Sequence, residues 1–190
     1  MIDVTTGEVI AKTQSDSLTG EYKVTIKEDA EELHKKRYNL EITKDDYFFE
    51  SMDIKPYDLP DLSEMKIRKR IPKIKKGKVY RITNINFYGD SPKPLPTSLP
   101  VFQSLLRLME KNPTLKISVE GHTNGCHQSW AYSKKLSTAR AETVRNYLIE
   151  NGIDGNRLKS KGFSCDKMLY PSPISARQQM LNRRVEIRIL

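Results

Sequence analysis

Polar side chains in the second half of the sequence have the chemistry needed to bind a small charged group. Arg140 lies in the run from Leu136 to Ala141, and Asn182-Arg183-Arg184 comes shortly before the last residues. A guanidinium binds a carboxylate through two parallel charge-assisted hydrogen bonds. The side-chain oxygen of Asn124 can accept a hydrogen bond from an ammonium group. Taken one at a time, such residues more often form surface ion pairs or solvated basic clusters.

The chain offers little for catalysis or for metal binding. It contains His34, His122 and His127 but no serine-centred turn, no paired metal-ligand motif and no glycine-rich phosphate loop. Cys126 and His127 are adjacent, and neighbouring side chains diverge, which is poor geometry for a nucleophile and its base. His122, at the end of an expected strand, is more often structural than a ligand. We therefore expect a non-enzymatic protein without cofactor or metal ion.

The net charge of +9 suits an anionic partner, such as nucleic acid, an acidic lipid surface or a polymer that carries carboxylates. Much of this charge lies between Lys66 and Lys78, a run that is typical of a solvated linker or edge strand. Because no nucleic-acid recognition motif accompanies it, we expect no nucleic-acid partner. No apolar run approaches the ~20 residues that span a bilayer. Met1 does not begin a signal peptide, so we expect any targeting segment to lie outside this sequence.

Two cysteines, Cys126 and Cys165, lie far apart and belong to no Cys-x-x-Cys pair. This spacing argues against a zinc site and against thioredoxin-type chemistry. They are either two reduced thiols or one disulfide, and the choice depends on the compartment.

The expected secondary structure that must position these residues changes near residue 72, from strands alone to strands alternating with helices. In residues 1–72, apolar residues mostly alternate with polar ones, which indicates half-buried strands. Strands are expected at Tyr22–Ile26, Tyr38–Ile42 and Tyr47–Phe49, with a helical turn or loop at Asp29–Lys36. Short strands at this spacing predict a small β-sandwich.

Residues 73–190 show strands alternating with helices. The pattern predicts a strand ending at Ile85 and Phe87, a helix with the stripe Phe102, Leu105, Leu106 and Met109, a strand at Leu115–Val119, a helix from near Ser137 to Gly152, and strands at Leu158–Phe163 and Val185–Ile189. This order predicts an α/β sandwich with both helices on one face of the sheet. The expected fold class of the whole chain is α+β.

Five ordered motifs carry a family resemblance. They are Ile117 to Thr123, Leu136 to Ala141, Asn151-Gly152-Ile153 with Arg157-Leu158, Lys161-Gly162-Phe163, and Asn182 to Ile187. This series resembles the OmpA C-terminal-like family, which includes peptidoglycan-associated lipoproteins and flagellar stator anchors. The resemblance covers about Val79 to Leu190. It implies a periplasmic domain with a β-α-β-α-β-β core that binds peptidoglycan without a covalent bond.

The resemblance also implies a binding site for the diaminopimelate of the peptide stem. The implied site residues are Thr123, Asn124, Ser133, Leu136, Arg140, Asn182 and Arg183. Arg140 resembles the family's carboxylate-binding arginine, whereas Asn124 stands where most members have an aspartate. Asp90 is an acid that could compensate for the missing charge. Ser133 and Gln179 depart from the usual asparagine and arginine of the family.

The implied function is anchoring of an outer-membrane or periplasmic envelope complex to the cell wall. In an oxidising periplasm we expect a Cys126–Cys165 disulfide, since each cysteine follows one of two parallel strands. The alternative function is an envelope scaffold that keeps the fold but has lost peptidoglycan binding.

The first half has a less specific resemblance. Thr6-Gly7-Glu8, Thr19 to Val24 and Tyr38 to Phe49 look like carboxypeptidase-regulatory-like β-sandwiches, over roughly Ile2 to Ile54. Such domains often precede OmpA-like domains in envelope proteins, and the family name implies no peptidase activity. We expect this half to contact other outer-membrane or periplasmic proteins.

Overall fold

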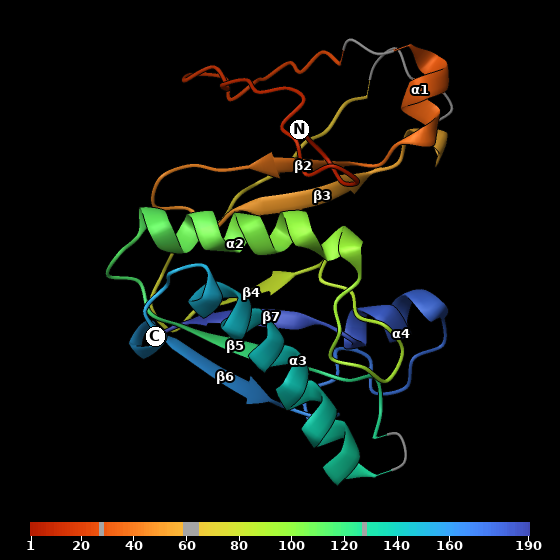
Figure 1. Ribbon diagram of the computed structural model, residues 1–190, viewed down its shortest axis with the longest axis vertical. Helices are drawn as coiled ribbons and strands as arrows, with labels where there is room; N and C mark the ends of the chain where they lie inside the picture. Colours follow the sequence, from red (N-terminus) through yellow and green to blue (C-terminus); the bar gives the residue numbers. More distant parts are fainter. Residues whose placement is uncertain (27–28, 59–64, 127–128) are drawn as a thin grey trace.

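The computed structural model describes residues 1–26, 29–58, 65–126 and 129–190. It contains two β-sheets and four α-helices within these residues, which confirms the α+β class (Figure 1). The N-terminal sheet lies on one side of helix α2, and the larger C-terminal sheet lies on its other side (Figure 1).

The N-terminal sheet has three antiparallel strands in the order β1-β2-β3. These are β1 (Ile2–Asp3), β2 (Tyr38–Ile42) and β3 (Glu50–Ile54), with helix α1 (Ala30–Lys35) before β2 and a 3-10 turn at Pro56–Asp58 after β3. Tyr38, Leu40 and Ile54 form its small buried cluster. The strand predicted at Tyr38–Ile42 and the helical turn before it are both confirmed.

Two N-terminal expectations differ from the structure. Tyr22–Ile26 alternates half-buried and exposed residues, yet it forms no strand, because no segment among the described residues pairs with its backbone. Tyr47 makes only an isolated bridge to Lys73, after which Phe48 and Phe49 enter the core of the C-terminal half. A period of two reports which side chains face the protein, not whether a hydrogen-bonding partner exists. The described residues therefore form one sheet in this half, where we predicted a sandwich.

The C-terminal half follows the predicted β-α-β-α-β-β order, with one added helix. Its elements are β4 (Val79–Ile82), a 3-10 turn (Pro96–Ser98), α2 (Leu99–Lys111), β5 (Ile117–Gly121), α3 (Trp130–Glu150), a 3-10 turn (Gly155–Arg157), β6 (Leu158–Gly162), α4 (Ala176–Asn182) and β7 (Val185–Ile189). The strands lie in the order β4-β7-β5-β6, with β5 and β6 parallel and β7 antiparallel to both β4 and β5.

Three boundaries differ from the sequence pattern. Strand β4 ends at Ile82, before Ile85 and Phe87, although Ile85 is still buried. Helix α3 begins almost two turns before Ser137, because Ser129 caps it by accepting a hydrogen bond from the backbone N–H of Tyr132. Helix α4 was not predicted, since its sequence has no apolar periodicity.

Helix α3 lies directly on strands β5 and β6. Ala141, Val144 and Leu148 are fully buried against the sheet, as predicted. At Gly121, an added Cβ would lie 2.1 Å from the carbonyl oxygen of Ser137, and at Gly162 it would lie 2.4 Å from the backbone nitrogen of Thr138. Only glycine allows this close approach. The two glycines therefore fix where the middle of α3, and with it Arg140, is held.

Contacts between the two halves are specific. The ring of Phe48 stacks on Tyr80 with centroids 4.4 Å apart. Asn84 donates through Nδ2 to the carbonyl oxygen of Ser51 at 3.0 Å. Glu41 on β2 forms an ion pair with Arg107 on α2. The N-terminal sheet is thus fastened to the C-terminal half by aromatic packing and by polar bonds.

Candidate functional site

Arg140 on α3 is buried under the loop that follows β4. Only 7% of the residue is exposed. Its Nε donates to the carbonyl oxygen of Ser91 at 3.1 Å, and its Nη2 donates to that of Tyr88 at 3.3 Å. The guanidinium carbon lies 5.1 Å from the centre of the Phe87 ring. The guanidinium is therefore held in one place by neutral groups.

The charge of this guanidinium is not neutralised by contact. Within the described residues, Arg140 forms no ion pair with a carboxylate, and its Nη1 makes no hydrogen bond. Burial lowers the pKa of Arg140, the nearby Asp90 carboxylate opposes this, and the positive charge of Arg183 adds to it. Asp90 and Arg183 are both exposed. The structure thus brings these three predicted residues into electrostatic range of one another.

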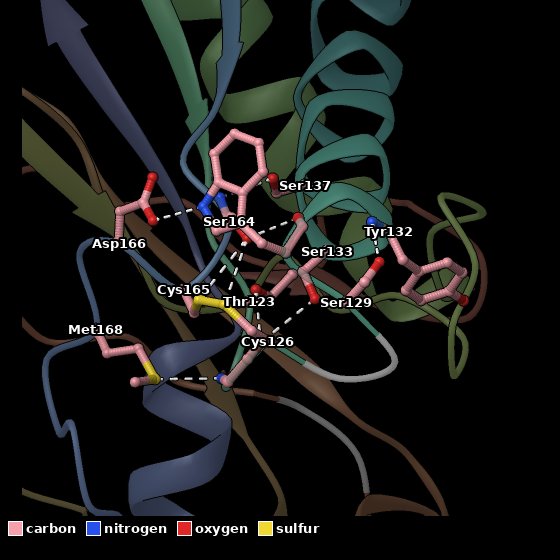
Figure 2. The surroundings of a disulfide bond; sticks show 12 residues. Thr123, Cys126, Ser129, Tyr132, Ser133, Ser137, Ser164, Cys165, Asp166 and Met168 are labelled. Atoms are coloured by element: carbon pink, nitrogen blue, oxygen red, sulfur yellow. Dashed lines mark hydrogen bonds between the residues drawn. A yellow bond between two sulfur atoms is a disulfide. The ribbon is translucent and has the colours of Figure 1, made fainter.

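The loop after β5 carries Thr123 and Asn124 and is tied down at both ends. The backbone N–H of Thr123 donates to Ser164 at 3.0 Å, and its Oγ1 donates to Gly125 at 3.1 Å. Gly125 has a φ of 81°, which favours glycine, and its N–H points at the sulfur of Met168, 3.1 Å away. Figure 2 shows these groups around the disulfide.

The predicted disulfide between Cys126 and Cys165 is present. The two residues are 39 positions apart in sequence, and their Cα atoms are 5.4 Å apart (Figure 2). Closing a loop of this length contributes about 3–4 kcal/mol in the chain-entropy model. The bond joins the Asn124 loop to the segment after β6. His127, which follows Cys126, lies outside the described residues.

Asn182 acts as a support for Asn124. It is fully buried, and its side-chain oxygen accepts from the backbone N–H groups of Leu169 and Tyr170 at 2.9 and 3.0 Å. Its Nδ2 donates to the carbonyl oxygen of Tyr170 and to Oδ1 of Asn124, at 2.8 and 2.9 Å. Asn124 keeps its second Oδ1 lone pair for another donor. Asn182 therefore positions the loop from within the protein.

Two further residues of the predicted site lie apart from the guanidinium. Ser133 is 1% exposed, and its Oγ lies 3.5 Å from the carbonyl oxygen of Gly125, beneath the loop of Thr123. Leu136 is half-buried on α3. In the part of the chain that the structure describes, no hydrogen bond joins Arg140 to Asn124. The predicted residues thus form two sets that both contact α3. One set surrounds the Arg140 guanidinium, and the other surrounds the loop of Thr123 and Asn124.

A cleft of ≈ 570 Å³ adjoins the loop that covers Arg140. Tyr88, Lys93, Phe102, Thr143 and Tyr147 are among its lining residues, and Arg140 is not. The guanidinium of Arg140 therefore does not line this cleft.

A charged cluster on the sheet was missed by sequence reasoning. Glu120 and Glu186 are direct cross-strand neighbours on β5 and β7. Arg188 binds Glu120 with both Nε and Nη2, at 2.5 and 3.1 Å, while Arg184 donates to Glu186 at 2.7 Å. The available signal was the alternation of charged with apolar residues along both strands, which places the charges on one face.

His122 completes this cluster. It is 1% exposed, and its Nε2 lies 3.3 Å from Glu186, at ion-pair distance, although neither ring nitrogen makes a well-directed hydrogen bond in the described structure. Burial alone would raise the pKa of Glu186, yet the nearby His122 and the hydrogen-bonded, charged Arg184 lower it to about 2. Candidate ligand atoms of Glu120, His122 and Glu186 lie within 4.8 Å of one another. Because arginines already occupy both carboxylates, the cluster fits an internal ion-pair network better than a metal site.

The fold and these motifs define the class of the C-terminal half. Residues 86–179 match the OmpA family. The C-terminal half is therefore an OmpA-like domain. None of the helices in the described structure is both long enough and apolar enough to span a membrane.

The chain is similar in part to two bacterial outer-membrane proteins. Outer membrane porin F of Pseudomonas aeruginosa is 31% identical over 107 residues, which cover 56% of this chain and 30% of the relative. Outer membrane protein A of Bordetella avium is 44% identical over 62 residues, covering 32% of this chain and 30% of that protein. The chain thus matches less than a third of the length of each.

Solved structures share the fold. The cell wall anchor of the type VI secretion system of Pseudomonas aeruginosa is 27% identical, with a TM-score of 0.50 over 57% of this chain and 78% of that one. The periplasmic domain of Helicobacter pylori MotB is 22% identical, with a TM-score of 0.52 over 62% and 78% of the two chains. The carboxypeptidase-regulatory-like resemblance of the first half stays a prediction.

Proposed function

We propose that this protein is a non-enzymatic cell-wall anchor whose OmpA-like domain binds the peptide stem of peptidoglycan through Arg140. The single observation that supports this most is the state of its guanidinium. It is buried and fixed, yet its partners are the neutral carbonyl oxygens of Tyr88 and Ser91. A cation without a contacting counter-ion, in a partly desolvated place, interacts strongly with an arriving anion.

Diaminopimelate has the matching chemistry. It presents a carboxylate beside an ammonium group, and the free Nη1 of Arg140 supplies a donor for the carboxylate. Asn124, held by Asn182, offers its remaining oxygen lone pair to the ammonium, and the exposed Asp90 carboxylate supplies negative charge near the guanidinium. Hydrogen bonds to charged groups contribute about 1.5–3 kcal/mol, against about 1 for neutral ones. We therefore expect the Asn124 contact to be the weaker of the two.

The comparisons support the same function at a coarser level. A structure described as a cell wall anchor shares this fold at 27% identity, and the named relatives are outer-membrane proteins. We therefore place the protein in the periplasm, bound to the wall and associated with the outer membrane. The N-terminal sheet is proposed to contact other envelope proteins.

The test is sedimentation with isolated murein sacculi. The full chain should sediment with the sacculi, and Arg140→Ala should lower the bound fraction by at least about tenfold, the loss expected when a charge-assisted hydrogen bond is removed. Arg145→Ala is the matched control. Arg145 lies on the same helix and also donates through Nε to a backbone carbonyl, that of Leu158 at 3.3 Å.

Circular dichroism and urea unfolding must show that the Arg140→Ala protein is folded. Normal sedimentation of a folded Arg140→Ala protein would refute the assignment of Arg140. If the unchanged chain also fails to sediment, the protein is an envelope scaffold that keeps the fold without binding the wall.

A further inference from the structure

Residues 167–183, which we call the basic tip, have an unusual composition. This stretch contains Lys167, Arg177 and Arg183 and no aspartate or glutamate. All three basic residues are exposed. The tip therefore carries three of the positive charges of the chain and no negative charge within its own residues.

The basic tip also exposes large apolar side chains. Ile174 is 90% exposed and Met180 is 55% exposed. Ile174 directly precedes Ser175, the residue that caps α4. An apolar residue at this position usually packs against the fourth residue of the helix, but that residue is the polar Gln179. Ile174 therefore has no intramolecular role of this kind.

The geometry of α4 holds these side chains outward. Arg177 and Met180 are three residues apart on α4, so they lie on the same side of the helix, and the exposed Arg183 follows as its C-cap residue. The opposite side is anchored by the buried Asn182, whose side chain joins the helix end to the Tyr170 segment and to Asn124. Figure 1 shows α4 at the side of the molecule, beyond the end of the sheet. The tip is thus a fixed projection whose outer side is basic and apolar.

A second basic group adjoins the tip. The ammonium groups of Lys167, Lys161 and Lys134 lie 3.9, 5.0 and 5.9 Å from the centre of the Phe163 ring. None of these lysines forms an ion pair with a carboxylate in the described structure. Any two of them are separated by no more than about one Debye length at 0.1 M salt, ~10 Å. Their charges therefore act together on an anionic surface.

We propose that the basic tip docks on an anionic membrane surface, with its basic side chains at the lipid phosphates and with Ile174 and Met180 inserted among the acyl chains. An anionic bilayer matches both the basic and the apolar side chains of the tip. Electrostatic attraction to the lipid phosphates adds to the insertion of apolar side chains at the interface. This inference does not depend on wall binding, and the residues changed to test it (Ile174, Arg177 and Met180) lie outside the predicted wall-binding set.

The experiment is sedimentation of the full chain with phospholipid vesicles. Phosphatidylcholine vesicles in which about a third of the lipid is phosphatidylglycerol should bind the protein, and pure phosphatidylcholine vesicles should bind it at least about tenfold more weakly. Raising the salt concentration should also weaken binding, since the attraction is screened.

The apolar part is tested by the double variant Ile174→Ser/Met180→Ser, which should lower the partition coefficient at least about tenfold. Leu18→Ser is the matched control, because Leu18 is 94% exposed and lies outside the tip. Arg177→Glu tests the charge and should weaken binding about tenfold.

Absence of binding to the anionic vesicles would overturn the proposal. Equal binding by the double variant and the unchanged chain would also overturn it. Sacculus sedimentation of the same variants separates the two proposals, because a tip variant should keep wall binding while it loses vesicle binding.

Discussion

Arginines in two places of the OmpA-like domain have opposite surroundings. Arg184 and Arg188, beside and on β7, donate to the carboxylates of Glu186 and Glu120. Arg140 on α3 donates to carbonyl oxygens. The hydrogen bond to Glu120 raises the pKa of Arg188, whereas burial lowers the pKa of Arg140. The first pair is internally neutralised, and the second arginine keeps its charge for a partner.

The difference shows that the group to which an arginine donates decides whether it stabilises the fold or is available to bind a ligand. On β5 and β7 the strand register places Glu120 opposite Glu186, within reach of arginines on the same face. On α3 the Arg140 side chain donates to backbone carbonyl oxygens of a loop, and the Asp90 carboxylate of that loop lies nearby without forming an ion pair with it in the described structure. We infer that the strand arginines stabilise the fold and that Arg140 is available for binding. The following predictions test this division.

The largest effect is expected from removal of a carboxylate on the sheet. Glu120→Ala removes the buried carboxylate that Arg188 binds; the Glu120 side chain is 4% exposed and the Arg188 side chain is 34% exposed. The free energy of unfolding should fall by about 2–3 kcal/mol, because two charge-assisted hydrogen bonds are lost. Urea unfolding measures this. Glu31→Ala, in an exposed pair with Lys35, is the control and should cost less than about 0.5 kcal/mol.

The same variant should lose stability without losing wall binding. The Glu120→Ala protein should still sediment with sacculi at a temperature where it is folded. Loss of binding in a folded Glu120→Ala protein would contradict the division between the two arginine groups.

An intermediate effect is expected from acid. The pKa of Glu186 is about 2 in the folded protein, below the ordinary value of 4.5. A depressed carboxyl pKa contributes stability that is fully present above pH 4.5 and is lost as the pH falls toward 2. The contribution is on the order of 2 kcal/mol. Urea unfolding across this range should show a smaller decline for Glu186→Gln than for the unchanged chain.

Glu110→Gln, at an exposed position on α2, is the control for this pH series. An equally steep decline for Glu186→Gln would mean that other carboxyl groups account for the acid sensitivity.

The smallest effect is expected at Asn124. Asn124→Asp restores a carboxylate, and Asn182 can donate to either side chain, so the loop should keep its conformation. Affinity for a diaminopimelate-containing peptide should rise about tenfold, because a charged acceptor replaces a neutral one. Calorimetric titration measures the change. Unchanged affinity in a protein that binds the peptide would show that another group holds the ammonium.

Much of the fold was predictable from local patterns. The apolar stripes of α2 and α3, the alternation in β2, β5 and β7, and the turn at Gly152 were all visible, since periodicity and glycine act over a few residues. The start of α3 was not predicted, because it depends on the Ser129 cap and the first turns of the helix have only a weak apolar pattern. The prediction of a strand at Tyr22–Ile26 was wrong, because a strand needs a second chain segment to pair with, and that segment can lie far away in the sequence.

For the candidate site too, some features follow from the sequence and others only from the tertiary structure. The sequence by itself determined the order of the motifs, the identity of Arg140 and Asn124, and the two cysteines that form the disulfide. Only the tertiary structure decided that Arg140 meets carbonyl oxygens while Arg188 meets Glu120, and that Asn182 is buried as a support. The physical reason is that a partner is set by strand register and by helix placement, which depend on residues far apart in the chain.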